Sequence, residues 1–300
     1  MYFYKCSWII FVCCIFFSCT NHMQERIQYT LHQAGENSSE LKKVLDHYQN
    51  QPEKLKAARF LIANIPAHRT YVGKEIDSLK QMKKESIQQG RISDEIVTHW
   101  KSFDYSSSQV VKDIDVIKAD ILIENIDLAF EAWEKRSWSK QYSFEDFCEY
   151  VLPYRIGDEP LEKWRRIYYE RYSPVLDSLY QGNDVVEAAR VMANYLKEEG
   201  FTNHTDFNLP HLGALFLLEN RVGYCRDNCD IATYVMRSLG IPITMDFYEM
   251  SPSYNSRHFW SALIDTTGLV VPFNYIEREI VRRPQEERKK GKVYRTCYGI

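Results

Sequence analysis

Apolar residues in the first half of the chain recur every three or four positions, which places them on one side of an α-helix. One such stripe begins after Pro52, a residue that suits the first turn of a helix, and ends near Pro66. The same spacing predicts helices over 114–134 and from Asp184 to Glu199, where Gly200 follows as a stop signal. The pattern therefore predicts helices through most of the chain up to residue 200.

An aromatic and charged block from Tyr142 to Tyr172 interrupts this pattern. Ser143 followed by Asp146 is typical of a helix cap, and Pro153 and Gly157 divide the block into two pieces. Aromatic-rich segments are commoner in protein cores than in clefts. We therefore interpret the block as a link between two packed helices rather than as the wall of a binding site.

After residue 200 the pattern changes to short segments rich in β-branched and aromatic residues, which are typical of strands. Three strands are predicted, at 242–250, 258–265 and 269–275. Asp265-Thr266-Thr267-Gly268 supplies a turn between the last two. Because a helix over 226–239 precedes them, the predicted fold class is α+β: an α-helical N-terminal region, then a helix packed on a small antiparallel sheet.

Composition excludes some functions. The 38 Lys and Arg residues nearly balance the 41 Asp and Glu residues, for a formal charge of −3. A nearly neutral surface argues against a nucleic-acid partner, which would favour a basic excess. The sequence also contains no Gly-rich phosphate loop, no His-Glu-x-x-His and no Gly-x-Ser-x-Gly, so nothing favours nucleotide, zincin or serine-hydrolase chemistry.

The first nineteen residues, which hold four of the eight cysteines, have the anatomy of a secretory signal. Lys5 precedes an apolar run, 6–18, that is too short to span a bilayer. The Ser18-Cys19 junction resembles the lipobox of bacterial lipoproteins. This resemblance implies that residues 1–18 are removed and that Cys19 is lipidated. The protein would then be a membrane-anchored lipoprotein on the periplasmic side; an ordinary cleaved signal or an uncleaved anchor is the alternative.

Among the other four cysteines, Cys225 stands where nucleophilic chemistry is expected. It follows Gly223-Tyr224 and directly precedes the helix predicted over 226–239. The first turn of a helix has unpaired N–H groups and a positive dipole end, which favour a thiolate and can stabilise an oxyanion. His258 opens the second predicted strand and Asn274 lies at the end of the third, so they can be cross-strand neighbours. We predict that Cys225 attacks a carbonyl carbon, His258 transfers the proton and Asn274 orients the imidazole.

Four motifs in this order resemble the core of the transglutaminase-like superfamily. They are Gly223-Tyr224-Cys225-Arg226-Asp227, Arg237-Ser238-Leu239-Gly240-Ile241-Pro242, His258-Phe259-Trp260 and Val271-Pro272-Phe273-Asn274. The resemblance covers 183–275 and implies a papain-like domain over 183–300, behind a helical region over 19–182. It implies the same roles for Cys225, His258 and Asn274. The family usually has Asp where Asn274 stands; Asp265 is an alternative, although a turn-forming Asp is the favoured interpretation.

The resemblance implies acyl transfer from a peptide or protein substrate through a thioester on Cys225. With water as acceptor the protein would be a periplasmic peptidase or amidase, which we favour; with an amine it would be a cross-linking transglutaminase. A lipoprotein that only binds a peptide or glycopeptide on the same fold is the alternative from another class. No cofactor is predicted.

Other residues are open to more than one interpretation. Cys225, Cys229 and His258 lack the second cysteine pair typical of structural zinc, so no metal is predicted. Cysteines outside motifs are usually buried packing residues, which is our interpretation of Cys148, Cys229 and Cys297. Several upstream residues could donate to the oxyanion, and none is preferred: Asn203, His204, Asn208 and His211.

Overall fold

The computed structural model describes residues 22–88, 98, 103–203, 209–250, 257–282 and 291–299. The predicted leader and Cys19 lie outside the described residues, and so do His204 and Asn208. Within the described part of the chain, no helix combines the length and the apolar composition that crossing a membrane requires. The leader, the anchor and the periplasmic location therefore stay predictions.

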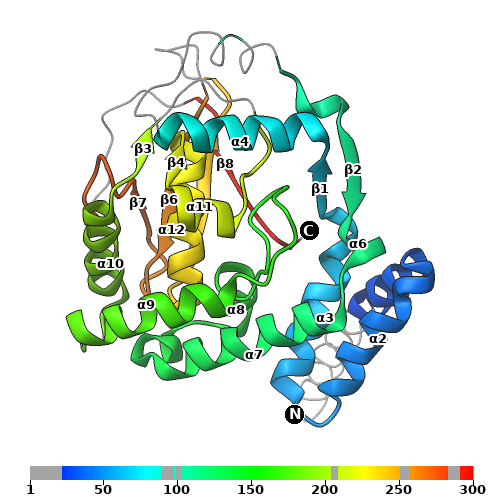
Figure 1. The fold of residues 1–300 in the computed structure, drawn as a ribbon. Helices are drawn as coiled ribbons and strands as arrows, with labels where there is room; N and C mark the ends of the chain where they lie inside the picture. Colours follow the sequence, from blue (N-terminus) through cyan, green and yellow to red (C-terminus); the bar gives the residue numbers. More distant parts are fainter. Residues whose placement is uncertain are drawn as a thin grey trace, which may run out of the picture.

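The N-terminal half consists of helices and one short antiparallel pair of strands (Figure 1). A helix over 22–33 comes first. It is followed by α2 (Ser38–His47), α3 (Pro52–Asn64), α4 (Lys74–Gln88), α6 (Asp113–Val116), α7 (Ala119–Lys135) and α8 (Phe144–Tyr150). The strands β1 (Arg69–Val72) and β2 (Gln109–Lys112) pair antiparallel. Helix α3 confirms the stripe that begins at Pro52, and the capping box of Ser143 and Asp146 confirms the predicted cap of α8.

The single helix predicted over 114–134 is wrong, because the chain is extended at Ile117 and Lys118 between α6 and α7. The break has a visible cause in side-chain hydrogen bonding. The Asn37 amide donates to the carbonyl oxygens of Ile114 and Ile117, at 3.1 and 2.9 Å. A continuous helix would have committed the Ile114 carbonyl to the backbone N–H four residues later.

The C-terminal half is a central helix packed between a sheet and other helices. Its helices are α9 (Arg165–Leu179), α10 (Val185–Glu199), α11 (Ala214–Asn220) and α12 (Cys225–Ser238). Its sheet has the order β7-β6-β5-β8 and is antiparallel throughout. The strands are β5 (Ile243–Tyr248), β6 (His258–Ile264), β7 (Val270–Phe273) and β8 (Tyr294–Arg295), and two short parallel strands, β3 (Thr202–Asn203) and β4 (Val222–Gly223), lie outside it. The predicted α+β class is confirmed.

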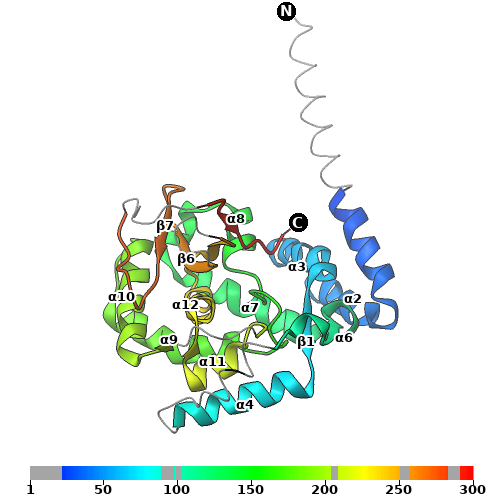
Figure 2. The same cartoon turned by 90° about the horizontal axis from the view of Figure 1, so that it is seen from above.

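Helix α12 lies at the centre of this half. Figure 2 shows it end-on, with β6 on one side and α9 and α11 on the other. Every residue of α12 after Cys225 is buried. Only its first residue therefore has partial access to solvent, and that residue is the predicted nucleophile.

The buried apolar residues form two clusters, one in each half. The first cluster runs from Ile27 to Tyr154 and includes Tyr298, whereas the second contains α9, α12 and the sheet. The two cores thus divide near residue 155, except that Leu79 and Trp138 belong to the second cluster, and α9 packs with α12. The domain limit at residue 183, inferred from motif coverage, stays a prediction.

The middle of the aromatic and charged block, 151–156, is buried, which agrees with a packed link rather than the wall of an open binding site. Tyr154, Arg155 and Trp164 are all buried. The Arg155 guanidinium forms an ion pair with Asp113 and donates to the Thr70 hydroxyl at 2.7 Å. The block therefore joins the strand pair β1–β2 to the centre of the molecule.

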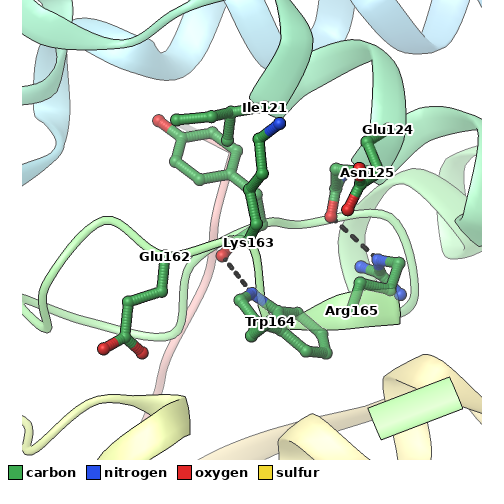
Figure 3. Close-up of a pocket in the computed structure, with 8 residues that line it drawn as sticks. Ile121, Glu124, Asn125, Glu162, Lys163, Trp164 and Arg165 are labelled. Atoms are coloured by element: carbon green, nitrogen blue, oxygen red, sulfur yellow. Dashed lines mark hydrogen bonds between the residues drawn. The ribbon is translucent and has the colours of Figure 1, made fainter. Parts of the chain in front are cut away.

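Arg165, the first residue of α9, is a fully buried cation held by neutral oxygens (Figure 3). Its guanidinium donates to the Asn125 side-chain oxygen at 2.8 Å and to the Arg237 carbonyl, in the last turn of α12, at 2.9 Å. It also donates to the three carbonyls that follow α8, those of Val151, Leu152 and Pro153. Because the C-terminal end of a helix carries partial negative charge, two helix ends replace a carboxylate partner here. Burial and the neighbouring Arg237 nevertheless lower the Arg165 pKa.

The cavity beside Arg165 is too small for a substrate. Figure 3 shows its lining, which includes Asn125, Trp164 and Arg165. Its volume is about 10 Å³, no more than one water molecule requires. This region therefore holds the structure together and is not a binding site.

The last described segment, 291–299, also joins the two halves. Strand β8 pairs with β5, and four residues later Tyr298 stacks on His68 with ring centroids 4.3 Å apart. The backbone N–H groups of Tyr298 and Gly299 donate to the Glu149 carboxylate at 2.5 and 3.0 Å.

Replacing Arg165 by Ala should strongly destabilise the protein, since four carbonyl groups and one amide lose a charged donor. We expect a loss of at least about 3 kcal/mol in the free energy of unfolding, measured by urea denaturation. The matched control is Arg166→Ala, because Arg166 is 52% exposed and lies 3.8 Å from Glu124. The control should change stability by less than about 0.5 kcal/mol. Equal effects of the two substitutions would contradict the role of Arg165.

Candidate active site

The turn before α12 is built to place Cys225 at the helix N-terminus. A Cβ on Gly223 would come within 2.3 Å of the Asp227 side chain, so only glycine leaves room for that carboxylate to fold back. The Asp227 carboxylate accepts the Tyr224 N–H at 3.0 Å, which caps the helix. Asp227 thus has a structural role at the start of α12.

Arg226 secures the same turn from the other side. Its guanidinium donates to the Leu209 carbonyl at 2.7 Å and lies 3.7 Å from the Asp227 carboxylate. It also lies over the Tyr224 ring, 4.9 Å from the centroid. The residues on both sides of Cys225 are therefore held by charge and by ring packing.

The sulfur of Cys225 lies against the first residues of β6. The backbone N–H groups of Phe259 and Arg226 hydrogen-bond to it, which lowers the pKa of the thiol, but burial has the larger effect and raises that pKa above its ordinary value. This effect of burial opposes the expected influence of the helix N-terminus. The first-turn N–H groups lower the pKa of the Cys225 thiol, but desolvation outweighs them.

His258 is the first residue of β6 and precedes Phe259, whose N–H meets the sulfur. It pairs with Tyr248 of β5. The His258 ring is stacked on Trp260 with centroids 6.1 Å apart, and it lies 5.9 Å from the Tyr248 ring. Helix α12 and strand β6 thus bring Cys225 next to the backbone segment that carries His258, with aromatic rings fixing the imidazole.

Asn274 directly follows β7 and is 5% exposed. Its side-chain oxygen accepts the N–H groups of Ile276 and Glu277, at 3.0 and 3.4 Å, so it forms the turn after β7. The β6–β7 register pairs Ser261 with Phe273. One step further along this register, Asn274 falls opposite Trp260, two positions from His258. The orienting role of Asn274 stays a prediction beside this turn-forming role.

Asp265 is the alternative to Asn274, and its side chain forms hydrogen bonds within its own turn. Its carboxylate accepts the Thr266 N–H and the Thr267 hydroxyl, both within 2.9 Å, and binds Arg282. The same guanidinium binds the Asp184 carboxylate, which caps α10. The interpretation of Asp265 as a turn former is confirmed.

The described oxyanion candidates have different surroundings. The Nδ1 atom of His211 lies 2.7 Å from the Asp230 carboxylate, so its ring belongs to an ion-pair network. Asn203 in β3 pairs with Gly223 of β4, which places it beside the turn that ends at Cys225. Of these two, Asn203 therefore has the better location.

The other described cysteines fit the packing interpretation only in part. Cys148 and Cys229 are buried, whereas Cys297 is exposed, so that part of the prediction is wrong. Burial strongly raises the pKa of the Cys229 thiol. Among the described residues, no three His, Cys, Asp or Glu side chains gather as they would around a metal ion.

No protein-family model matches the chain, and no curated protein matches it. Among solved structures, the chain is similar in part to a protein from Cytophaga hutchinsonii that is provisionally described as a cysteine protease. The two chains are 13% identical and align with a TM-score of 0.30, over 45% of this chain and 48% of the other. This chain thus spans about half the length of that protein.

The raised pKa of Cys225 predicts how the thiol reacts. Alkylation by iodoacetamide should increase with pH with a midpoint above about 8.5, the ordinary thiol value, since only the thiolate reacts. Peptide mass spectrometry at each pH separates Cys225 from Cys148, which should stay unlabelled in the folded protein because it is buried. A Cys225 midpoint near pH 7 or below would show a preformed thiolate and contradict the effect of burial.

Proposed function

We propose that this protein is a cysteine-dependent acyl-transfer enzyme, and that it hydrolyses amide bonds of peptides through a thioester on Cys225. The proposal rests on the contact between α12 and β6. The partly exposed sulfur at the helix N-terminus accepts the N–H of Phe259, the residue that follows His258. A nucleophile and a base distant in sequence thus belong to adjoining segments, and the proposed acyl transfer needs their side chains to come within hydrogen-bond reach.

In the first half of the reaction, His258 takes the proton from the Cys225 thiol as the sulfur attacks the substrate carbonyl carbon. A proton transfer concerted with attack suits a thiol whose pKa burial raises. The new S–C bond leaves a tetrahedral oxyanion. When it collapses, the C–N bond breaks, the amine leaves with the proton from His258, and the acyl group stays on Cys225.

In the second half, water attacks the thioester carbonyl while His258 takes a proton from that water. The C–S bond then breaks, the carboxylic acid leaves, and the proton returns to the sulfur. The oxyanion in both halves would be stabilised by backbone N–H groups in the first turn of α12. We assign the additional side-chain donor to Asn203, because β3 holds it beside Gly223. Asn274 would fix the turn after β7 and support His258.

An amine in place of water would make the protein a transglutaminase, with an isopeptide product. We place the reaction at the periplasmic face of a membrane, on the basis of the leader and Cys19 in the sequence. No step requires a cofactor. The alternative is a protein that binds peptides in the same place without cleaving them.

Hydrolysis of a library of quenched fluorescent peptides tests the proposal. Wild-type protein should cleave a subset of the library, Cys225→Ala should abolish cleavage, and His258→Ala should reduce it by about 10²- to 10⁴-fold. Cys297→Ala is the matched control, since Cys297 is an exposed thiol outside the site. Dansylcadaverine, added as an amine acceptor, should remain unincorporated.

Two results would overturn this proposal. Cleavage that persists in Cys225→Ala would exclude the nucleophile. Peptides that bind wild-type protein and Cys225→Ala equally, and that neither protein cleaves, would establish the binding alternative. Thermal unfolding of each variant, followed by circular dichroism, shows whether a lost activity reflects lost folding.

A further inference from the structure

Four aromatic rings form a continuous row that begins next to Cys225 and crosses three strands. Tyr224 contacts Phe259 of β6 edge to face, with centroids 6.1 Å apart. Phe259 stacks on Phe247 of β5 at 5.3 Å, and Phe247 stacks on Tyr294 of β8 at 5.5 Å. The strand register explains the row, because Phe247 pairs directly with both Phe259 and Tyr294. Directly paired residues point to the same face of a sheet.

The row is partly exposed at Tyr224, beside the nucleophile, buried at its second ring, and exposed again at the sheet edge. Phe259 is buried, Phe247 is half-buried and Tyr294 is 40% exposed. Val293, at 40%, and Met250, at 63%, add exposed apolar surface near the ends of β8 and β5. Exposed apolar side chains that continue a row of rings are the kind of surface that marks a binding site.

The faces of the rings are occupied, and this limits what the row can bind. Phe247 has a ring stacked on either side. The ammonium of Lys292 lies over the Tyr294 ring, 4.9 Å from its centroid, and the Arg226 guanidinium lies over Tyr224. A sugar would need a free ring face to stack on. The row instead presents ring edges, which carry partial positive charge and pack against the face of another aromatic ring or against an apolar chain.

We infer that this row is the subsite for a substrate side chain, and that it selects an aromatic or large apolar residue close to the scissile bond. The inference rests on the proposed function, since it places the side chain beside a carbonyl attacked by Cys225. Lys292 at the exposed end disfavours a basic side chain on the substrate by charge repulsion. The subsite would therefore rank aromatic residues above alanine and alanine above lysine.

The test compares acyl donors that differ at one position only. In a peptide amide series scanned with Phe, Ala and Lys at each position near the cleaved bond, one position should show kcat/KM about tenfold higher for Phe than for Ala. Tyr294→Ala and Phe247→Leu should each reduce this ratio several-fold. Leu269→Ala is the matched control, because Leu269 is an exposed apolar residue before β7.

A second measurement distinguishes a wrong assignment of the subsite from a wrong assignment of the enzymatic activity. Binding of the same peptides to Cys225→Ala, measured by calorimetry, should show the same preference for Phe and the same loss with Tyr294→Ala. A binding preference without any wild-type turnover would overturn the proposed activity and support the subsite. Turnover or binding with no preference between Phe and Ala, or with a preference unaffected by Tyr294→Ala, would overturn the subsite. Tighter binding of a glycan chain than of any peptide would do so as well.

Discussion

The structure depends on one buried cation. The Arg165 guanidinium donates hydrogen bonds to the carbonyls that follow α8 and to a carbonyl in the last turn of α12. The partial negative charge of two helix ends, rather than a carboxylate, offsets its positive charge. Burying a guanidinium is costly unless its donors are satisfied, and here each of its three nitrogens donates at least one hydrogen bond. Helix α12 is thereby fixed at its C-terminal end, about 18 Å from the residue at its start. The scaffold and the candidate site are two ends of one rigid element.

The opposite end of α12 presents a single reactive group. Asp227 caps the helix, Gly223 leaves room for that cap, and Arg226 holds the preceding loop. Cys225 is left partly exposed in a site whose burial favours a thiol. A thiol needs a base, and the adjoining start of β6 carries His258. Because desolvation raises the pKa of this thiol, its reactivity depends on a positioned base.

The sequence predicts much of this arrangement, because its signals are local. Periodicity and capping located α3, α10 and α12, and turn residues separated β6 from β7. What it missed depends on contacts distant in the chain. Asn37 divides the helix predicted over 114–134, the desolvation of Cys225 depends on the packing of a sheet, and the aromatic row needs a register that joins Phe247 to Tyr294. Alternation along the strands predicts which residues share a face with Phe247 and which share a face with Phe259. It does not predict that these rings lie near Tyr224.

The central claim is that Cys225 forms a covalent acyl intermediate, and intact-protein mass spectrometry tests it most directly. The protein is mixed with the p-nitrophenyl ester of N-acetylphenylalanine, an activated donor, and quenched in acid within seconds. The account predicts a mass increase of one acyl group that maps to Cys225, is absent from Cys225→Ala, and forms more slowly in His258→Ala. An adduct of equal size and yield in Cys225→Ala, or no adduct in the folded wild-type protein, would contradict it.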